Sequence, residues 1–308
     1  MKTLTLADAA LGIETLLVQR NPRGMATVRE ALTPGYLLRA ARRLLALREL
    51  APSATVALLT GFPVDDTVET DGPAGVHALY HALERAGLSP LIWTDPLVTP
   101  ELFPALRTAP LPDPTTMNDC AKPEALIVIE RPGAAADGRF YNIRGRDISD
   151  RCTPIEPLLQ RLNCPVIAIG DGGNEVGMAR AGEALKALPI VPAASSCHEL
   201  IVADVSNWGG YALAALIHSL CGSETDTNHD RVSIEPLLKQ LVAAGAVDGV
   251  TGAATMTEDS FPAQAGDTLL VQIHDILQMC DPLGAGPADN PEQSPQQQPD
   301  QQPQEADD

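Results

Sequence analysis

The sequence predicts an α/β protein with a mostly parallel, doubly wound (Rossmann-like) sheet and helices on both of its faces. Short apolar runs rich in β-branched residues recur along the chain, and they have the length and composition of buried strands. Stretches with helical periodicity separate these runs. Polar or glycine-containing loops follow the runs directly, as in open α/β sheets that bind ligands there. The predicted strands are residues 55–61, 91–95, 125–129, 166–169 and 199–203.

The length of the chain, 308 residues, allows one large domain with a sizeable core. We expect a single α/β domain over residues 1–283, with N-terminal helices within residues 1–50 packed on it. Residues 284–308 are rich in Pro, Gln and Asp and contain six acidic residues but no Lys or Arg. Such a composition offers little apolar surface to bury, so this tail is predicted to be disordered.

The formal net charge of −19 disfavours nucleic-acid binding, because an acidic protein repels phosphate groups. The six cysteines are scattered without a C-x-x-C pair, which is typical of reduced thiols rather than of disulfides or a zinc site. No apolar run approaches the length of a membrane span, and residues 1–20 lack the layout of a signal peptide. We therefore expect a cytoplasmic protein that acts on a small molecule, with no nucleic-acid or membrane partner. A homo-oligomer remains compatible with the sequence.

The most informative stretch is residues 165–178, PVIAIGDGGNEVGM. Its apolar run is predicted to be a central strand, and the glycines around Asp171 allow a tight turn with close backbone approach to a ligand. A helix over 176–188 is predicted to follow, with Asn174 as its N-cap. A strand, a glycine turn and a capped helix form the usual ligand-binding unit of such sheets. The alternative is a turn that needs glycine for its shape alone.

Polar side chains follow the carboxyl ends of several predicted strands. Glu69 and Asp71 lie in the long loop after the first strand, and Asn207 lies just before a predicted helix over 211–221. Because these ends meet at one edge of a parallel sheet, we expect a cleft crowded with carboxylates. Such crowding is unfavourable unless a cation or bound protons compensate for it. The carboxylates concerned are Glu69, Asp71, Glu130, Asp171 and Glu175.

Six segments taken together resemble the D-glutamate cyclase family, over roughly residues 30–280. They are ETDGP (69–73), ERPG (130–133), ADGRFYNIRGRDIS (136–149), IGDGGNEVGM (169–178), VSNWGGYAL (205–213) and DGVTG (248–252). The combination of GDGGNE-x-GM with SNWG in this order is the specific part of the resemblance. Two departures stand out. Ala134 replaces an arginine after ERPG, and residues 253–260 keep the acidic Asp259 but lose the basic residue and the glycine expected there.

The resemblance implies conversion of D-glutamate to 5-oxo-D-proline and water, which is the activity of a lyase. This reaction needs a base for the α-ammonium group and activation of a carboxylate as electrophile. A divalent cation, Mn²⁺ or Mg²⁺, held by oxygen ligands would supply the activation. We assign metal binding to Glu69, Asp71, Glu130, Asp171 and Glu175, and the catalytic role to Asp171, Glu175 and Glu130; which carboxylate is the base stays open.

Substrate contacts are assigned to seven further residues. The arginines among them could hold the substrate α-carboxylate or could serve as internal ion-pair partners. The seven are Arg131, Arg144, Arg146, Asn174, Asn207, Gly172 and Gly173.

Two other functions compete with this assignment. The GDGG turn resembles the glycine–aspartate turns of some kinases, which would make the protein a nucleotide-binding enzyme. However, the sequence has no G-x-x-x-x-G-K-[ST] or G-x-G-x-x-G motif, and Lys is scarce. A non-catalytic module that binds a metal or an amino acid is the other alternative, because resemblance to a family does not guarantee turnover.

Overall fold

The computed structural model describes residues 4–51, 53–117, 122–222 and 233–280. Within them a six-stranded, all-parallel sheet forms the centre of the molecule. Its strands are β1 (Thr55–Thr60), β4 (Ser89–Thr94), β5 (Thr108–Pro110), β6 (Ala125–Ile129), β7 (Val166–Gly170) and β8 (Glu199–Val202). Five of these strands confirm the prediction. The sixth, β5, was not predicted, since it is only three residues long and lies in a proline-rich segment. The predicted disordered tail lies outside the described residues.

The strand order is β5-β4-β1-β6-β7-β8. The chain therefore builds the sheet outward from β1 to the β5 edge, then returns beside β1 with β6 and builds outward to β8. This is the strand order of dinucleotide-binding Rossmann folds, and it confirms the Rossmann-like α/β prediction. The order reverses between β1 and β6. Ligands of such sheets bind beyond the carboxyl ends of the strands at this switch point.

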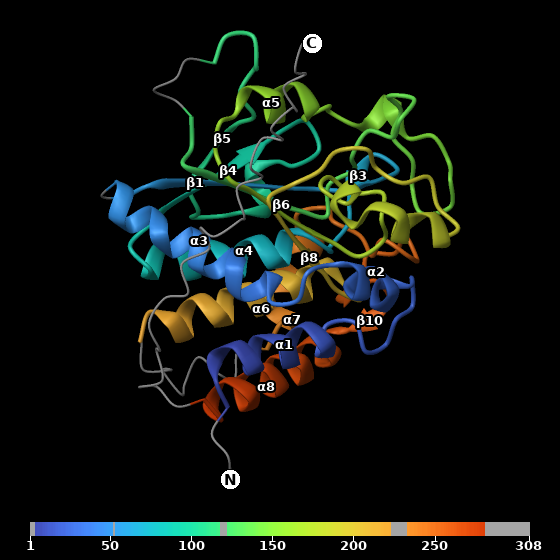
Figure 1. The fold of residues 1–308 in the computed structure, drawn as a ribbon. Coiled ribbons are helices and arrows are strands. Elements are labelled where there is room, and N and C mark those ends of the chain that lie inside the picture. The colour runs from blue at the N-terminus through green and yellow to red at the C-terminus, as the bar shows by residue number, and fades with distance from the viewer. Residues whose placement is uncertain (1–3, 52, 118–121, 223–232, 281–308) are drawn as a thin grey trace, which may run out of the picture.

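Helices flank the sheet on both sides (Figure 1). In Figure 1 α3, α4 and α6 lie beneath the sheet, α5 lies above it, and α1 and α8 form a further layer below α6. The α-helices are α1 (Leu6–Leu16), α2 (Met25–Ala31), α3 (Tyr36–Leu50), α4 (Pro73–Arg85), α5 (Glu156–Arg161), α6 (Ser206–Leu220), α7 (Glu235–Ala243) and α8 (Ala263–Gln278). Two short hairpins, β2–β3 (Pro63–Val64, Thr67–Val68) and β9–β10 (Thr257–Glu258, Phe261–Pro262), complete the site described below.

The segment after the central turn differs from its prediction. An α-helix over 176–188 does not form. The chain instead makes a turn and then the 3-10 segment η4, Ala179–Ala187, which Gly182 kinks with φ 57° and ψ −127°. Asn174 is consequently not an N-cap; its Nδ2 donates a hydrogen bond of 2.8 Å to the carbonyl oxygen of Tyr141. The predicted helix over 211–221 also starts earlier, because Ser206 already belongs to α6.

Helices α4 and α6 pack closely because both present glycine at their crossing. A Cβ atom on Gly210 would lie 2.9 Å from the Cα of Gly75, which is backbone and cannot rotate away. The close approach brings the N-termini of both helices to the switch point of the sheet. Within the described residues, no helix is long and apolar enough to cross a lipid bilayer.

We expect Gly210→Ala to destabilise the protein by about 1–3 kcal/mol, because the added methyl group forces the two helices apart. The corresponding decrease in Tm is about 2–5 °C and can be measured by calorimetry. Gly12→Ala in α1 is the matched control, since the nearest atom to its added Cβ is 3.9 Å away. This control should be neutral or slightly stabilising. Equal melting temperatures for the two variants would show that the helix crossing tolerates a side chain.

Candidate active site

Seven buried carboxylates from four segments of the chain meet near the carboxyl ends of the central strands. They come from the loop before α4, the end of β6, the turn after β7 and the hairpin β9–β10. Each residue is at most 8% exposed. The members of this acidic cluster are Glu69, Asp71, Glu130, Asp171, Glu175, Glu258 and Asp259. The structure thus brings together all five carboxylates that the sequence predicted to converge, and it adds the last two.

Asp71 and Asn207 tie the two central helices together. Asp71 accepts hydrogen bonds from the backbone N–H groups of Ser206 (2.8 Å) and Asn207 (2.6 Å) at the start of α6. The Oδ1 atom of Asn207 accepts hydrogen bonds from Gly72 (2.8 Å) and Gly75 (2.7 Å) at the start of α4. Each helix therefore receives its cap from the other. Asp71, predicted as a metal ligand, and Asn207, predicted as a substrate contact, both have this structural role.

Glu175 organises the glycine turn. Its Oε1 accepts hydrogen bonds from the N–H groups of Asp171 (3.0 Å) and Gly172 (2.6 Å), and its Oε2 accepts one from Gly173 (2.6 Å). Successive N–H groups that point inward form an anion-binding concavity. Here the bound anion is the carboxylate of Glu175, which follows the three N–H groups by two to four residues. The N–H groups of both predicted substrate-binding glycines are therefore directed at Glu175.

Asp171 is held by a residue that the sequence did not single out. The Nη2 atom of Arg23 donates to Oδ2 of Asp171, to Oδ2 of Asp259 and to the carbonyl oxygen of Asp204 (2.9 Å). The N–H group of Ser206 also donates to Oδ2 of Asp171 (3.2 Å). Arg23 thus brings a positive charge into the acidic cluster. Its Nε is buried and has no hydrogen-bond partner within the described residues.

Glu130 occupies a strained position at the end of β6. Its φ angle is 42°, a left-handed conformation that costs a non-glycine residue energy and that occurs preferentially at functional sites. Its Oε2 accepts a hydrogen bond of 2.6 Å from the hydroxyl group of Ser206. The hydroxyl of Thr60 lies nearby. A Cβ built on Gly72 would lie 2.2 Å from Thr60 Oγ1 and 3.0 Å from Glu130 Cβ. In the part of the chain that is described, this buried hydroxyl has no partner.

Burial and mutual repulsion change the protonation of the acidic cluster. Burial raises the pKa values of Glu69, Glu130 and Asp171 well above the ordinary range, and neighbouring carboxylates raise them further. Arg23 opposes the rise in the pKa of Asp171. Burial, with repulsion from Asp259, raises the pKa of Asp71 to about 8. At neutral pH the cluster therefore retains protons unless a cation replaces them.

Glu258 has a more structural environment than the other members. Its carboxylate accepts hydrogen bonds from Tyr211 (2.6 Å), Asn207 (2.8 Å) and Trp208 (3.2 Å) of α6. Burial raises the pKa of Glu258 to about 7, although these three hydrogen bonds oppose the rise. Glu258 thus anchors the hairpin β9–β10 to α6. The neighbouring Asp259 contacts Arg23, so the loop that departs from the family pattern does take part in the site.

The three arginines predicted to bind substrate lie in different environments. Arg131 is buried and pairs with Asp95 at 2.5 Å, while its other donors reach the carbonyl oxygens of Thr60 (3.1 Å) and Thr153 (3.0 Å). This is the internal ion-pair role that the sequence left open. Arg144 and Arg146 are exposed, and neither side chain has an ion-pair partner within the described residues.

These two exposed arginines belong to a turn that lies over the central glycines. The turn is closed by two hydrogen bonds: the Asn142 N–H group donates to the carbonyl oxygen of Arg146 (3.0 Å), and the Arg146 N–H group donates to the side-chain Oδ1 of Asn142 (3.0 Å). The neighbouring Ile143 has its Cδ1 atom 3.1 Å from the position of a Cβ on Gly172. The turn is tied down by the hydrogen bond from Asn174 to Tyr141 described above. This turn therefore contacts the Asp171 loop, and it carries the guanidinium groups of Arg144 and Arg146, which have no ion-pair partner among the described residues.

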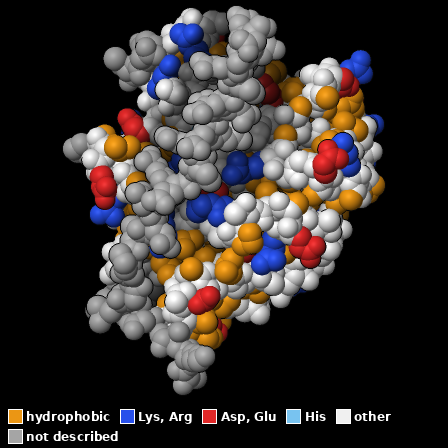
Figure 2. Space-filling model, in the orientation of Figure 1, with side chains coloured by type: hydrophobic (Ala, Val, Ile, Leu, Met, Phe, Trp, Pro, Cys, Tyr) orange, Lys and Arg blue, Asp and Glu red, His pale blue; other side chains and the backbone are white. Residues whose placement is uncertain are grey.

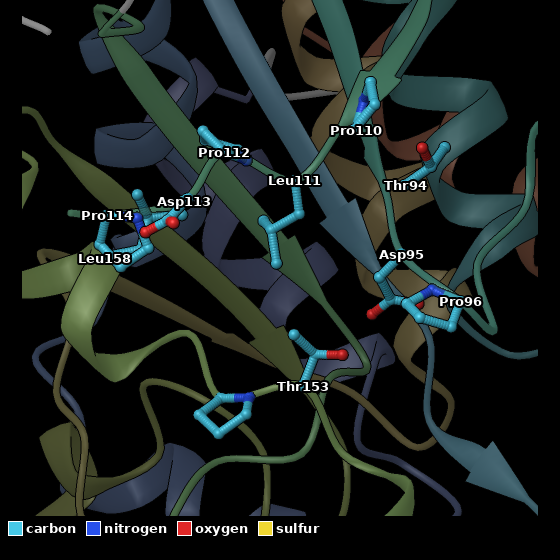
Figure 3. Close-up of a pocket in the computed structure, with 11 residues that line it drawn as sticks. Thr94, Asp95, Pro96, Pro110, Leu111, Pro112, Asp113, Pro114, Thr153 and Leu158 are labelled. Atoms are coloured by element: carbon cyan, nitrogen blue, oxygen red, sulfur yellow. The ribbon is translucent and has the colours of Figure 1, made fainter. Parts of the chain in front are cut away.

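A pocket of about 500 Å³ opens beyond the ends of β4 and β5 (Figure 3). It shares no residue with the acidic cluster. Its lining is mostly proline and leucine, with Asp95 and Thr153 at one end. The buried Arg131 binds both of these residues and directly follows Glu130 in the chain. The pocket is thus a neighbour of the acidic cluster, and all seven carboxylates of the cluster lie outside its lining.

The charge of the protein is partly hidden. On the face shown in Figure 2, basic, acidic and hydrophobic side chains are interspersed. The acidic cluster contributes nothing appreciable to the surface, because its members are all buried. A buried set of seven carboxylates with one guanidinium group is costly, and buried titratable groups with shifted pKa values cluster preferentially at functional sites.

The donor set fits a hard divalent cation. Two groups of three carboxylates, Asp71–Asp171–Asp259 and Glu130–Asp171–Glu175, each offer oxygen atoms within 4.8 Å of one another. Ligand oxygens on opposite sides of a Mg²⁺-sized ion are about 4 Å apart, so small adjustments would suffice. The unpartnered hydroxyl of Thr60 beside Glu130 supports an additional bound species at this place.

Comparison with known proteins identifies the family. The family model described as "D-glutamate cyclase-like, C-terminal" matches residues 13–274. The chain belongs to this family. The match begins before residue 30 and so includes the last turn of α1, all of α2 and Arg23, which the sequence motifs had left outside. The chain is 29% identical over 238 residues to the human protein "D-glutamate cyclase, mitochondrial"; the aligned region covers 66% of this chain and 39% of the human protein.

Sequence reasoning missed Arg23 and Thr60. Arg23 is separated from Asp171 by 148 residues and from Asp259 by 236 residues, so no local pattern connects them. Thr60 is the last residue of a strand and has no distinguishing neighbour in the sequence. Asp259 had one signal, since it is the residue of the departing loop that the family resemblance retained.

Proposed function

We propose that this protein cyclises D-glutamate to 5-oxo-D-proline and water. The human relative that it resembles carries the name D-glutamate cyclase, and the family membership covers most of the chain. The observation that supports the proposal most directly is the convergence of Glu130, Asp171 and Glu175 at the switch point of the sheet. Family membership alone would not indicate a competent site, whereas these carboxylates are the groups that the reaction requires.

The reaction forms one carbon–nitrogen bond and breaks one carbon–oxygen bond. The α-nitrogen attacks the side-chain carboxyl carbon of the same molecule and closes a five-membered lactam. The nitrogen gives up two protons, and the departing carboxyl oxygen gains both and leaves as water. A base worth about 10²–10⁴-fold in rate, an acid and stabilisation of the oxyanion are therefore needed.

The raised pKa values of Glu130 and Asp171 suit the proton transfers. A carboxyl group whose pKa lies above its ordinary range binds a proton more readily than an ordinary carboxylate, so Glu130 or Asp171 could take a proton from the substrate ammonium group and pass it to the departing oxygen. Glu175, fixed by three N–H groups, holds the turn that positions Asp171.

A divalent cation, Mn²⁺ or Mg²⁺, completes the proposal. Glu130, Asp171 and Glu175, with Glu69 and Asp71 close by, would hold it, and it would polarise the substrate carboxylate as a Lewis acid. Arg144 and Arg146 would receive the other carboxylate of the substrate, since both guanidinium groups are exposed on the turn that contacts Gly172.

The test is incubation of the purified protein with D- and L-glutamate, with and without Mn²⁺ or Mg²⁺, followed by a chiral assay for 5-oxoproline. We expect product from D-glutamate in the presence of metal. Product from neither enantiomer would contradict the proposal and would favour a non-catalytic binding module.

Removal of metal should also change stability. Binding of Mn²⁺ to the folded state alone, at about 100 times its Kd, should add about 2.7 kcal/mol to the free energy of unfolding. We expect Tm to rise on addition of Mn²⁺ and to fall on addition of EDTA, measured by calorimetry. A Tm that neither reagent changes would contradict a metal site in this cluster.

Nucleotide binding keeps one observation in its favour, the strand order shared with dinucleotide-binding folds. The loop after β1 opposes it. In those folds a glycine-rich turn leads directly into a helix, whereas here the hairpin β2–β3 intervenes before α4. Titration with ATP and NAD separates the two functions, and we expect no binding of either.

A further inference from the structure

The structure offers two groups of carboxylates for one cation, and both contain Asp171. The oxygen atoms of the two groups differ in how far protein donors already occupy them. This difference decides where a cation can bind without displacing part of the protein. The inference below rests on the metal-assisted function proposed above.

The group Asp71–Asp171–Asp259 is closed by protein cations and N–H groups. Arg23 Nη2 contacts Oδ2 of Asp171 and Oδ2 of Asp259, and so it occupies the space that their shared cation would take. Asp71 caps α6 with both of its oxygens, through Ser206 and Asn207. A metal in this group would have to displace a buried guanidinium group and weaken a helix cap.

The group Glu130–Asp171–Glu175 is more open, because no guanidinium group bridges two of its members among the described residues. Glu175 accepts N–H groups at both oxygens, as Asp71 does, but Glu130 and Asp171 do not. All N–H donors to Asp171 among the described residues reach Oδ2, which leaves Oδ1 without one. Glu130 uses Oε2 for the hydroxyl of Ser206, which leaves Oε1 without a donor in the described structure. The unpartnered hydroxyl of Thr60, a fully buried residue, lies beside Glu130. Buried polar groups without a partner point to a missing ligand or water.

We propose that Glu130, Asp171 and Glu175 hold the cation, and that Arg23 is a positioning residue that closes the neighbouring Asp71–Asp171–Asp259 group. Arg23 fixes Asp171 through Oδ2 and thereby presents Oδ1 to Glu130 and Glu175. Partners behind a ligating carboxylate commonly orient it in this way, and their loss typically costs 10–100-fold in metal affinity. Asp259 acts through Arg23 and does not touch the cation.

Mn²⁺ binding to the full chain, measured by titration calorimetry without substrate, tests the assignment. We expect one Mn²⁺ per wild-type chain. Glu130→Gln should lower the affinity at least tenfold, whereas Asp259→Asn should change it by less than about threefold. An Asp259→Asn variant that loses as much affinity as Glu130→Gln would overturn the proposal.

Arg23→Met should open the closed group, so that a second Mn²⁺ binds per chain. Arg20→Met is the matched control, since it removes the same charge from the same loop, where Arg20 lies over the rings of Trp208 and Phe261. The control should still bind one ion. If Arg23→Met does not fold, the Glu130 and Asp259 variants decide the assignment alone. Two ions in the wild type, or one ion with unchanged affinity in Arg23→Met, would overturn the role of Arg23.

Failure of this inference is distinguishable from failure of the proposed function. If the wild type forms 5-oxo-D-proline but the Asp259→Asn variant loses its affinity for Mn²⁺, only the ligand assignment is contradicted. A wild type with the expected affinity pattern but without product contradicts the cyclase function alone.

Discussion

Replacing Asp171 by Asn should abolish cyclisation while leaving the protein folded. Asn keeps the size of the side chain and an oxygen that can still accept from Ser206 and Arg23, but it removes the charge and the titratable proton. Loss of a group that serves as acid, base or metal ligand is expected to lower kcat/KM by about 10²–10⁴-fold or more. The chiral assay for 5-oxoproline measures the rate, and circular dichroism reports the fold.

Two other substitutions control this experiment. Asp150→Asn removes a charge from an exposed residue and should leave the rate unchanged. Gly173→Val should impair folding itself, because Gly173 has a φ angle of 97° and its Cβ would lie 2.4 Å from Ile190 Cδ1. Activity of Asp171→Asn close to that of the wild type would reduce Asp171 to a turn residue and would remove it from the mechanism.

The sequence predicted the parts of the site that depend on local pattern. Strand runs such as 125–129 and 166–169 are rich in β-branched residues; Glu130 follows the first directly, and Asp171 follows the second after Gly170. Because parallel strands share one carboxyl edge, the convergence of these carboxylates followed from fold class alone. The strand order did not, since hydrophobic periodicity is identical in every permutation of the strands.

The errors arose where a distant contact overrides local preference. Residues 176–188 have helix-forming composition, yet the chain is held in a turn by Glu175, whose carboxylate binds three N–H groups. Nothing local in the sequence shows that Asn207 caps α4, whose first residue lies more than 130 positions earlier, and its assignment to substrate stays a prediction. Arg23 lies in a short loop between two helices, and its partners are fixed only by the tertiary fold.

The architecture explains how so many carboxylates can be buried together. The N-terminus of α6 directs the N–H groups of Ser206 and Asn207 at Asp71, and the positive end of the helix dipole favours negative charge there. The glycine turn directs three further N–H groups at Glu175. Arg23 supplies a full charge. These groups offset only part of the repulsion, since the pKa values of Glu69, Glu130 and Asp171 remain raised.

The repulsion that remains among the carboxylates should be visible as an unusual dependence of the protein's stability on pH. A carboxyl group whose pKa is higher in the folded than in the unfolded state keeps its proton on folding, so folding takes up protons. The stability of the metal-free protein is therefore greatest below the unfolded pKa of about 4, as far as these groups are concerned. It declines as pH rises towards the folded values, which are about 7 for Glu258 and about 8 for Asp71.

We accordingly expect the Tm of the metal-free protein to be several degrees higher at pH 6 than at pH 8.5, measured by calorimetry in the presence of EDTA. Saturating Mn²⁺ should flatten or reverse this trend, because the cation binds the deprotonated carboxylates and replaces their protons. Asp171→Asn should reduce the slope, since it removes one titrating group, and the exposed Asp150→Asn should not. A metal-free Tm that stays constant or rises between pH 6 and pH 8.5 would show that the acidic cluster is already fully ionised and compensated by the protein itself.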